Sequence, residues 1–330
     1  MIITKTPYRI SFFGGGSDYP VFCHQYGGQI LSTAIDKYCY LSVRELPPFF
    51  PHKHRLVYSK IESVLSASDL SHPVVREMLL DLNVDKMGWE IHHDGDLPAR
   101  AGLGSSSTFT VGLYNALSNL AGSSRSKNEL ADYAIRFEQS ILKESVGYQD
   151  QIAAAFGGFN KITFHKGGGY DVTPVQISRR RRYELESHLL LVFTGVTRFA
   201  SKIAEEQISS SHTNTDKLKK MVQMVDDAMS ILGSENENIA DFGFLLDDAW
   251  KYKKSLTDKI SSNSLDEIYE TAKGAGAIGG KLLGAGGGGF FLFFAAPYLH
   301  DQIIHALGNL VHVPFKFSDF GSTVIFNSTQ

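Results

Sequence analysis

The chain has 330 residues, of which 43% are apolar and 20% are charged, and its formal net charge is −3. The length suggests about two domains, and the near-neutral charge gives no electrostatic footprint for nucleic acid or an anionic membrane. The N-terminus lacks the basic region and apolar stretch of a signal peptide, and no apolar run approaches the ~20 residues of a membrane span. We therefore expect a cytoplasmic globular protein whose two cysteines, Cys23 and Cys39, are core thiols in a reducing compartment.

The N-terminal part of the chain predicts mostly strands. Residues 8–13 read as a strand that runs into the glycine turn 14–16, and the β-rich apolar content of residues 29–45 indicates two more strands. Prolines at positions 47, 48 and 51 then predict a loop. The next expected elements are a small helix at 73–82 and a strand at 88–93.

The stretch from Pro98 to Ser107 reads Pro-Ala-Arg-Ala-Gly-Leu-Gly-Ser-Ser-Ser and precedes apolar residues at helical spacing. Serine is a preferred N-cap, so the serines at 105–107 predict the start of a helix over 105–120. A glycine-rich turn entering a helix N-terminus directs several unpaired N–H groups and the positive end of the helix dipole at one point. This arrangement suits an anion, most often phosphate, although a flexible loop with a good cap would contain the same residues.

A second helix, with Ser126 as its cap and its end at Gly147, is expected after this stretch. The run Arg179–Arg182 is interpreted as a solvated turn, with phosphate binding as the less favoured alternative. The other expected elements are a helix at 148–156, strands at 159–164 and 188–194, helices between 199 and 275 interrupted near His212 and Gly233, a strand at 290–295, a helix at 298–308, and β-rich pieces at 311–317 and 322–326. The second half thus predicts an α+β arrangement, and we place a domain boundary near residue 185.

Residues 274–289 are glycine-rich and match G-x-G-x-x-G twice, from Gly274 and from Gly284. A dinucleotide site needs a strand before this motif and a helix after it. Here residues 265–273 look helical and a strand follows, so we reject a Rossmann site. A Walker A loop is also excluded, because Gly280-Lys281 lacks the earlier glycine and the following Ser or Thr. The phosphate loop at 102–107 therefore belongs to another design.

Phosphoryl transfer needs a phosphate cradle, Mg²⁺ ligands, a cation near the transferred group and a carboxylate near the nucleophile. Glu138 and Asp150 could supply the carboxylates, one holding Mg²⁺ through oxygen and one orienting a hydroxyl. The residue pattern alone, however, favours Glu138 as a solvated helix residue. Arg9 is a candidate phosphate clamp, and Asp18 could accept hydrogen bonds from a polyol or serve only in an Asx-turn.

Three motifs, in order over nearly the whole chain, resemble those of the GHMP kinase superfamily, which includes galactokinase, homoserine kinase, mevalonate kinase and phosphomevalonate kinase. They are Lys5-Thr-Pro7-Tyr-Arg9-Ile-Ser-Phe-Phe-Gly14-Gly-Gly-Ser-Asp18-Tyr, Pro98-Ala-Arg-Ala-Gly-Leu-Gly-Ser-Ser-Ser107 and Lys281-Leu-Leu-Gly284-Ala-Gly-Gly-Gly-Gly-Phe290. The resemblance implies an α+β, two-domain GHMP kinase fold. A ribosomal-protein-S5-like α/β domain that binds ATP would cover residues 1–185, and a ferredoxin-like α+β domain residues 186–330.

The resemblance also implies roles for particular residues. Mg²⁺ would be held by Ser106 and Glu138, Asp150 would be the catalytic carboxylate, and Arg9 would lie beside the γ-phosphate. The ATP phosphates would be wrapped by Arg100, Ala101, Gly102, Leu103, Gly104, Ser105, Ser106 and Ser107. The sugar would contact Ser17, Asp18, Gly284, Ala285, Gly286 and Gly287.

Within the superfamily, Phe-Gly-Gly-Gly-Ser-Asp-Tyr-Pro around Asp18 and Glu144-Ser-Val-Gly-Tyr-Gln-Asp-Gln are most similar to the D-glycero-D-manno-heptose 7-phosphate kinases. These enzymes phosphorylate the anomeric C1 hydroxyl to give the 1,7-bisphosphate on the route to GDP-heptose. The implied ligands are ATP, Mg²⁺ and a small sugar phosphate. Candidates for binding the distal phosphate are Arg100, Lys161, Arg198 and Lys202.

Two alternatives remain open. The first is a GHMP kinase for another acceptor, such as fucose, galactose or mevalonate; the turn before Asp18 lacks the glutamate and histidine of galactokinases, which argues against galactose. The second is a non-catalytic sensor that binds ATP and sugar. The presence of Asp150 and Ser106 disfavours it, because such a protein is expected to have lost one of them.

Overall fold

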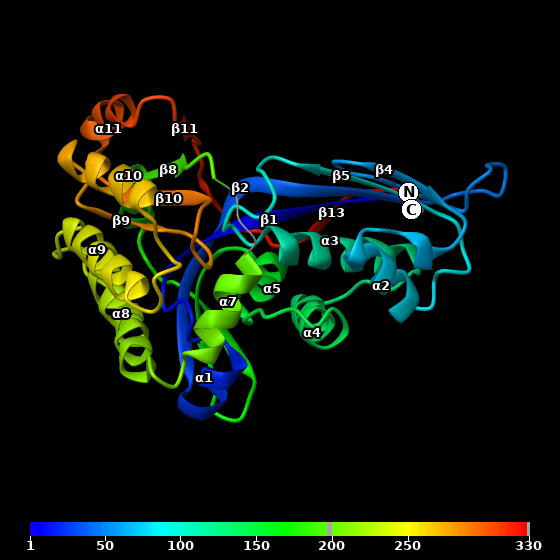
Figure 1. The fold of residues 1–330 in the computed structure, drawn as a ribbon, viewed down its shortest axis with the longest axis horizontal. Coiled ribbons are helices and arrows are strands. Elements are labelled where there is room, and N and C mark those ends of the chain that lie inside the picture. Colours follow the sequence, from blue (N-terminus) through cyan, green and yellow to red (C-terminus); the bar gives the residue numbers. More distant parts are fainter. Residues whose placement is uncertain (197–199, 329–330) are drawn as a thin grey trace.

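The computed structural model describes residues 1–196 and 200–328, and its strands form two separate sheets (Figure 1). The larger sheet has the order β13-β1-β2-β5-β3-β4, with β6 and β12 also paired to β2 and β7 paired to β6. Its strands are β1 (Ile2–Phe13), β2 (Gly28–Glu45), β3 (His54–Val57), β4 (Ile61–Val64), β5 (Trp89–Gly95), β6 (Phe159–Phe164), β7 (Tyr170–Pro174), β12 (Phe317–Ser318) and β13 (Thr323–Asn327). The smaller sheet has the order β11-β8-β10-β9 and consists of β8 (Leu189–Phe193), β9 (Gly279–Leu282), β10 (Phe290–Phe294) and β11 (Val311–His312).

The helices divide into two groups (Figure 1). Those that lie along the larger sheet are α2 (Pro73–Asp81), α3 (Ser105–Leu120), α4 (Lys127–Arg136) and α5 (Gln149–Phe156). Those that lie with the smaller sheet at the other end of the molecule are α8 (Thr215–Gly233), α9 (Ala240–Lys254), α10 (Asn263–Gly274) and α11 (His300–Ala306). The remaining ones are α1 (Pro20–Tyr26), α6 (Arg179–Ser187) and α7 (Ala200–Ser209), with 3-10 turns at Ala67–Asp69 and Pro297–Leu299.

Helix α3 packs against strands β1 and β2 of the larger sheet. Its bounds, Ser105–Leu120, are those predicted from the sequence. Phe109, Leu113 and Leu117 are buried as their helical spacing predicted. Cys23 and Cys39 are buried free thiols, which confirms the predicted state of both cysteines.

Strand β2 is continuous over Gly28–Glu45, so the prediction of two strands in residues 29–45 was wrong. Along one edge it pairs with β1, and along the other it pairs in turn with β6, β12 and β5. Because successive partners occupy both edges, the backbone groups of this long strand are satisfied without a turn.

Ser126 caps α4 as predicted, and it forms a capping box with Glu129. The α-helix ends at Arg136, and a π-helical turn follows at Phe137–Ile141, so the predicted end at Gly147 was wrong. Turns of this kind often occur at functional sites. Here the turn carries Glu138, whose side chain is fully buried.

The run Arg179–Arg182 forms the first turn of α6 instead of a solvated turn. Arg181 is buried, and its Nη2 donates to the carbonyl oxygens of Ile231 (2.7 Å) and Glu237 (2.9 Å). The guanidinium thus joins α6 to the segment around the end of α8, which gives this arginine a structural role.

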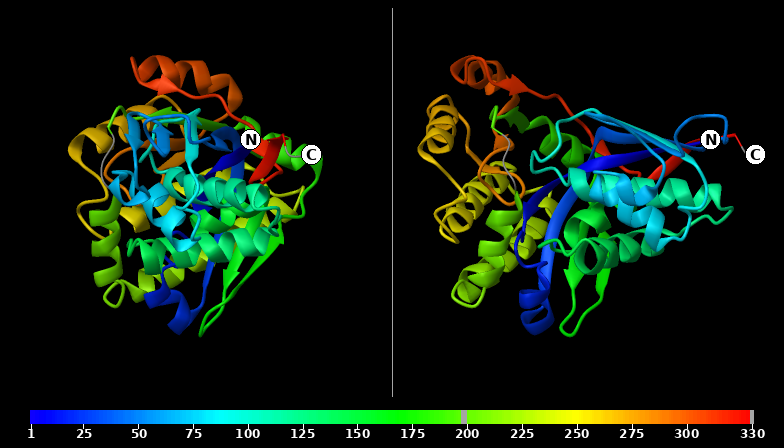
Figure 2. Two further views of the ribbon diagram at one scale, coloured as in Figure 1. Left: turned by 90° about the vertical axis from the view of Figure 1, so that its right-hand side faces the viewer. Right: turned by 45° about the vertical axis from the view of Figure 1, so that its right-hand side comes forward.

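The chain returns to the larger sheet at its end, where β13 pairs with β1. The backbone N–H of Ser328 donates to the Met1 carbonyl oxygen (3.0 Å), so the residue that follows β13 lies beside the start of β1 (Figures 1 and 2). Within residues 1–196 and 200–328, every helix is too short or too polar to cross a bilayer.

Candidate active site

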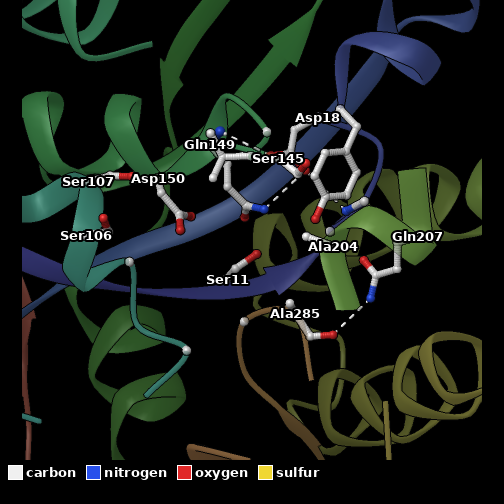
Figure 3. A pocket seen from close by; sticks show the side chains of 18 of the residues that line it. Ser11, Asp18, Ser106, Ser107, Ser145, Gln149, Asp150, Ala204, Gln207 and Ala285 are labelled. Carbon is white, nitrogen blue, oxygen red and sulfur yellow. Dashed lines mark hydrogen bonds between the residues drawn. The ribbon is translucent and has the colours of Figure 1, made fainter. Parts of the chain in front are cut away.

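A cavity of about 500 Å³ lies where the larger sheet and its helices meet the helices of the second half (Figure 3). Its walls come from the end of β1 and the turn after it, the N-terminus of α3, the loop before α5, helix α7, the end of α9 and the glycine loop 284–289. The volume is that of a small-molecule site.

The N-terminus of α3 opens onto this cavity. Its N-cap is Gly104 in the left-handed conformation (φ 76°), and no side chain caps the helix, so the expected serine cap was wrong. Ser105 Oγ instead accepts a hydrogen bond from the Arg100 backbone N–H (3.0 Å). The first N–H groups of the helix and the positive end of its dipole are therefore directed at the cavity, as an anion requires.

The loop before α3 touches the glycine loop of the second half at two glycines, Gly102 and Gly284. A Cβ on Gly102 would overlap the Leu283 carbonyl oxygen, and a Cβ on Gly284 would overlap the Gly102 backbone. Both residues also have left-handed φ values, +83° and +71°. Glycine at these positions lets the two loops meet at the edge of one cavity.

Arg9 and Asp150 form the polar centre of the site. Nε of Arg9 donates to Asp150 Oδ1 (2.8 Å), and its Nη2 lies 2.7 Å from the same oxygen. Nη1 of Arg9 donates to the Gly102 carbonyl oxygen (2.7 Å). The arginine is 4% exposed, whereas the Asp150 side chain is 29% exposed and lines the cavity. One guanidinium thus fixes the carboxylate and the phosphate loop relative to each other.

Asp18 is buried at the same cavity. Its Oδ1 accepts hydrogen bonds from the Gly16 N–H (3.2 Å) and Gln149 Nε2 (3.1 Å), and its Oδ2 accepts from the Gln149 N–H (3.2 Å). Burial raises the pKa of Asp18, and the nearby Asp150 carboxylate raises it further. Three donors on a carboxylate that faces a cavity make a fixed acceptor for hydroxyl groups.

Glu138 lies behind Ser107 and is not the solvated helix residue that its sequence pattern favoured. Its Oε2 accepts hydrogen bonds from Ser107 Oγ (2.9 Å) and Gln151 Nε2 (2.5 Å), while Oε1 is buried and has no partner. Burial raises the pKa of Glu138 to about 8. A carboxylate with an unused oxygen beside a serine hydroxyl fits a hard cation such as Mg²⁺, which takes oxygen ligands. Within the described chain no cluster of three or more His, Cys, Asp or Glu side chains that could hold a metal ion occurs.

Two buried lysines line the cavity, and no role was predicted for either of them. Lys253 Nζ donates to the carbonyl oxygens of Leu282 (2.6 Å) and Gly284 (2.5 Å), and Lys281 Nζ donates to that of Phe12 (2.7 Å). Burial lowers the pKa of Lys253 well below its usual value and that of Lys281 to about 7. In the described part of the chain neither ammonium has a carboxylate partner. Lys281 lies in the third motif, but Lys253 is one of three lysines in the last turn of α9 and looks like ordinary helix-end charge.

Some predicted site residues do not line the cavity. Ala101 and Leu103 are buried, and their carbonyl oxygens accept from the N–H groups of Phe290 and Arg9. Ser17 is buried and exchanges hydrogen bonds with the Gln29 backbone. Gly286 and Gly287 also do not line the cavity and lie against Ile260.

The four residues predicted as candidates for binding the distal phosphate do not all lie at the cavity. Arg100 lines the cavity. Lys161 instead forms an ion pair with Asp226 (2.7 Å). Arg198 and the side chain of Lys202 lie outside the described residues.

Two family models match the chain. The model of the GHMP kinases N-terminal domain covers residues 71–158, and that of the GHMP kinases C-terminal domain covers residues 230–312. The first range includes the phosphate loop, Glu138 and Asp150, and the second includes Lys253 and the glycine loop.

Three relatives extend the comparison to the whole chain. A D-glycero-alpha-D-manno-heptose 7-phosphate kinase of Campylobacter jejuni is 33% identical over 93% of this chain and 93% of its own length. The crystal structure of a D-glycero-D-manno-heptose 1-phosphate kinase from Bacteriodes thetaiotaomicron is 28% identical, with a TM-score of 0.80 over 99% of each chain. A bifunctional fucokinase/GDP-fucose pyrophosphorylase of Arabidopsis thaliana is 25% identical over 88% of this chain but only 29% of its own length.

Proposed function

The chain belongs to the GHMP kinases and is an ATP-dependent kinase of a sugar hydroxyl, and we propose that it phosphorylates the anomeric C1 hydroxyl of D-glycero-D-manno-heptose 7-phosphate. The observation that carries the proposal is the position of Asp150. It is held by Arg9 beside the phosphate loop and lies in one cavity with the buried carboxylate of Asp18. The identity with the heptose 7-phosphate kinase of Campylobacter jejuni supports the choice of acceptor.

The phosphate chain of ATP would lie at the N-terminus of α3. The N–H groups of Ser105, Ser106 and Ser107 and the helix dipole would stabilise its negative charge. Glu138 and Ser106 would hold Mg²⁺, with Ser107 fixing the Glu138 carboxylate. When bound, the ion would neutralise charge on the phosphate oxygens.

The acceptor hydroxyl would lie against Asp150. Its oxygen attacks the γ-phosphorus, the bond from the γ-phosphorus to the β–γ bridging oxygen breaks, and ADP leaves. The hydroxyl proton passes to the Asp150 carboxylate. An anomeric hydroxyl is more acidic than an ordinary alcohol, so the alignment by Asp150 and the positive charge of Arg9 matter more than basicity.

The distal phosphate of the acceptor would be bound by cations of the cavity wall. Arg100, Lys143, Lys253 and Lys281 are available there. Two of them, Lys253 and Lys281, are buried with no carboxylate in contact among the described residues, so an anionic ligand would favour the protonated, charged form that burial disfavours.

The test is release of ADP from Mg²⁺-ATP with a panel of acceptors: D-glycero-D-manno-heptose 7-phosphate, mannose, galactose, fucose and mevalonate. Turnover with the heptose phosphate, and a product whose new phosphate is at C1 by ³¹P NMR, is the expected result. Turnover only with an unphosphorylated acceptor would leave the kinase assignment intact and refute the heptose phosphate. Binding of ATP without turnover of any acceptor would favour a sensor.

A further inference from the structure

We propose that Ser11 and Gln149 bind the hydroxyl groups of the acceptor that neighbour the phosphorylated one, and so select a polyol with adjacent hydroxyls. This inference rests on the proposed sugar kinase function. It adds two residues to the acceptor site that neither the motifs nor the family comparison assigns.

Ser11 lies on β1 two residues after Arg9, so both side chains lie on the same face of the strand. The pairing of β1 with β2 shifts between Ser11 and Phe13, and irregularities of this kind re-aim side chains near active sites. Ser11 lines the same cavity as Asp150 and Gln149, and Figure 3 labels all three side chains there. An acceptor whose reacting oxygen meets Asp150 would therefore pass its next hydroxyls over Ser11.

The Ser11 hydroxyl has no hydrogen-bond partner although the residue is only 6% exposed. A buried hydroxyl without a partner costs free energy, and alanine would fill nearly the same space without that cost. A purely structural role therefore does not explain a serine here. A ligand hydroxyl that supplies the missing partner does.

Gln149 also has a buried polar atom without a hydrogen-bond partner. Its Nε2 donates to Asp18 Oδ1, which fixes the amide so that Oε1 is the free end. That Oε1 is buried, has no partner, and belongs to a residue that lines the cavity. Because an amide oxygen only accepts, the group that satisfies it must be a donor such as a hydroxyl.

The two free atoms define the ligand chemistry. Gln149 Oε1 requires a donor, whereas Ser11 Oγ can donate or accept, and the Asp18 carboxylate nearby accepts. Neighbouring hydroxyls of one sugar ring satisfy all three, because each hydroxyl both donates and accepts. An acceptor without hydroxyls on neighbouring carbons, such as mevalonate, whose two hydroxyls are at C3 and C5, would leave at least one of these buried atoms without a partner.

The first test is Ser11→Ala, with Ser63→Ala on the exposed strand β4 as its matched control. Loss of one neutral hydrogen bond to substrate predicts a rise in the acceptor KM of roughly threefold to tenfold. The KM for ATP should not change. The Tm without ligand should stay the same or rise, which a structural role of the serine would not produce. A Tm that falls, or KM values for both substrates that rise together, would refute the proposal.

The second test compares wild type, Ser11→Ala and Gln149→Met on monodeoxy analogues of the heptose phosphate. For Ser11→Ala the rise in acceptor KM should vanish with the one analogue that lacks the partner hydroxyl. For Gln149→Met it should become smaller with an analogue that lacks a neighbouring hydroxyl, and the remainder reflects the lost hydrogen bond from Nε2 to Asp18. Equal penalties on every analogue would refute the inference while wild-type turnover upheld the kinase proposal. If the wild type phosphorylated no sugar at all, the proposed function and this inference would fail together.

Discussion

At Asp150 the arginine that compensates the charge of the carboxylate also fixes its direction. Asp150→Asn keeps the shape of the side chain and removes its charge and its basicity. We expect kcat to fall by about 10²- to 10³-fold, with little change in the KM for ATP. Steady-state kinetics would measure both, and Asp226→Asn, which breaks an ion pair with Lys161 away from the cavity, is the control. Turnover of Asp150→Asn near the wild-type rate would exclude Asp150 as the catalytic carboxylate.

Glu138 makes stability depend on pH. Its pKa in the folded protein, about 8, lies above the ordinary value of 4.5, so the folded state retains the proton longer than the unfolded chain. The stabilisation that results is fully present below pH 4.5 and is lost as the pH rises through 8. Glu138→Gln does not titrate, so its Tm relative to wild type should be higher at pH 9 than at pH 5. The corresponding difference in the free energy of unfolding, relative to wild type, is on the order of a few kcal/mol.

Thermal unfolding of both proteins at pH 5, 7 and 9 without metal checks this expectation. The control is Glu235→Gln, at an exposed glutamate, whose Tm difference from wild type should be the same at each pH. A Glu138→Gln difference that is equally independent of pH would contradict the raised pKa. Glu138→Gln should also bind Mg²⁺-ATP more weakly than the wild type, because an amide oxygen is a poorer magnesium ligand than a carboxylate.

At the scale of elements, the site depends on the contact between the phosphate loop and the glycine loop. Gly102→Ala would place a methyl group on the Leu283 carbonyl and push the two loops apart. Gly122 offers a matched control, because it has the same left-handed φ (+75°) but no atom within 4 Å of its absent Cβ. Both variants should lose about 1 kcal/mol of stability from backbone strain. Only Gly102→Ala should also lose at least ~10-fold in kcat/KM, because displacement of the catalytic groups on the two loops lowers the rate by that much or more. Equal activity of the two variants would contradict this interpretation.

At the scale of the whole molecule, we propose that residues 1–185 and 186–330 are two domains that complete each other. Strands β12 and β13, which belong to residues 186–330, pair with β2 and β1, which belong to residues 1–185. Residues 1–185 alone would expose β1 as an edge and lose the packing of Phe317 in the core. We therefore expect the full chain to unfold in a single calorimetric transition, and the 1–185 piece to unfold at least ~10 °C lower or without cooperativity. A 1–185 piece as stable as the full chain would show that the terminal strands are dispensable.

Local patterns along the chain were sufficient to predict helix α3 and the phosphate loop that precedes it. Periodicity and cap residues act within a turn or two of helix, so the bounds of α3 and the Ser126 cap of α4 could be predicted before any tertiary contact was known, whereas the serine cap expected for α3 was wrong. The phosphate loop was recognisable from its glycines and serines, and Arg9, Asp18 and Asp150 were recognisable from the motifs that resemble those of the GHMP kinases. Lys253 was not, since helix-end lysines look alike whether or not they line a cavity.

Which of these groups are buried, paired or left without a partner depends on contacts between distant segments and could not be predicted from local patterns. The Arg9–Asp150 hydrogen bond joins residues 141 positions apart, and no local pattern records such a contact. The burial of Glu138, the continuous strand β2 and the unpaired atoms of Ser11 and Gln149 depend in the same way on segments distant in sequence. The physical reason is that desolvation and hydrogen-bond satisfaction are properties of the assembled cavity, whereas helix propensity and capping are properties of a few neighbouring residues.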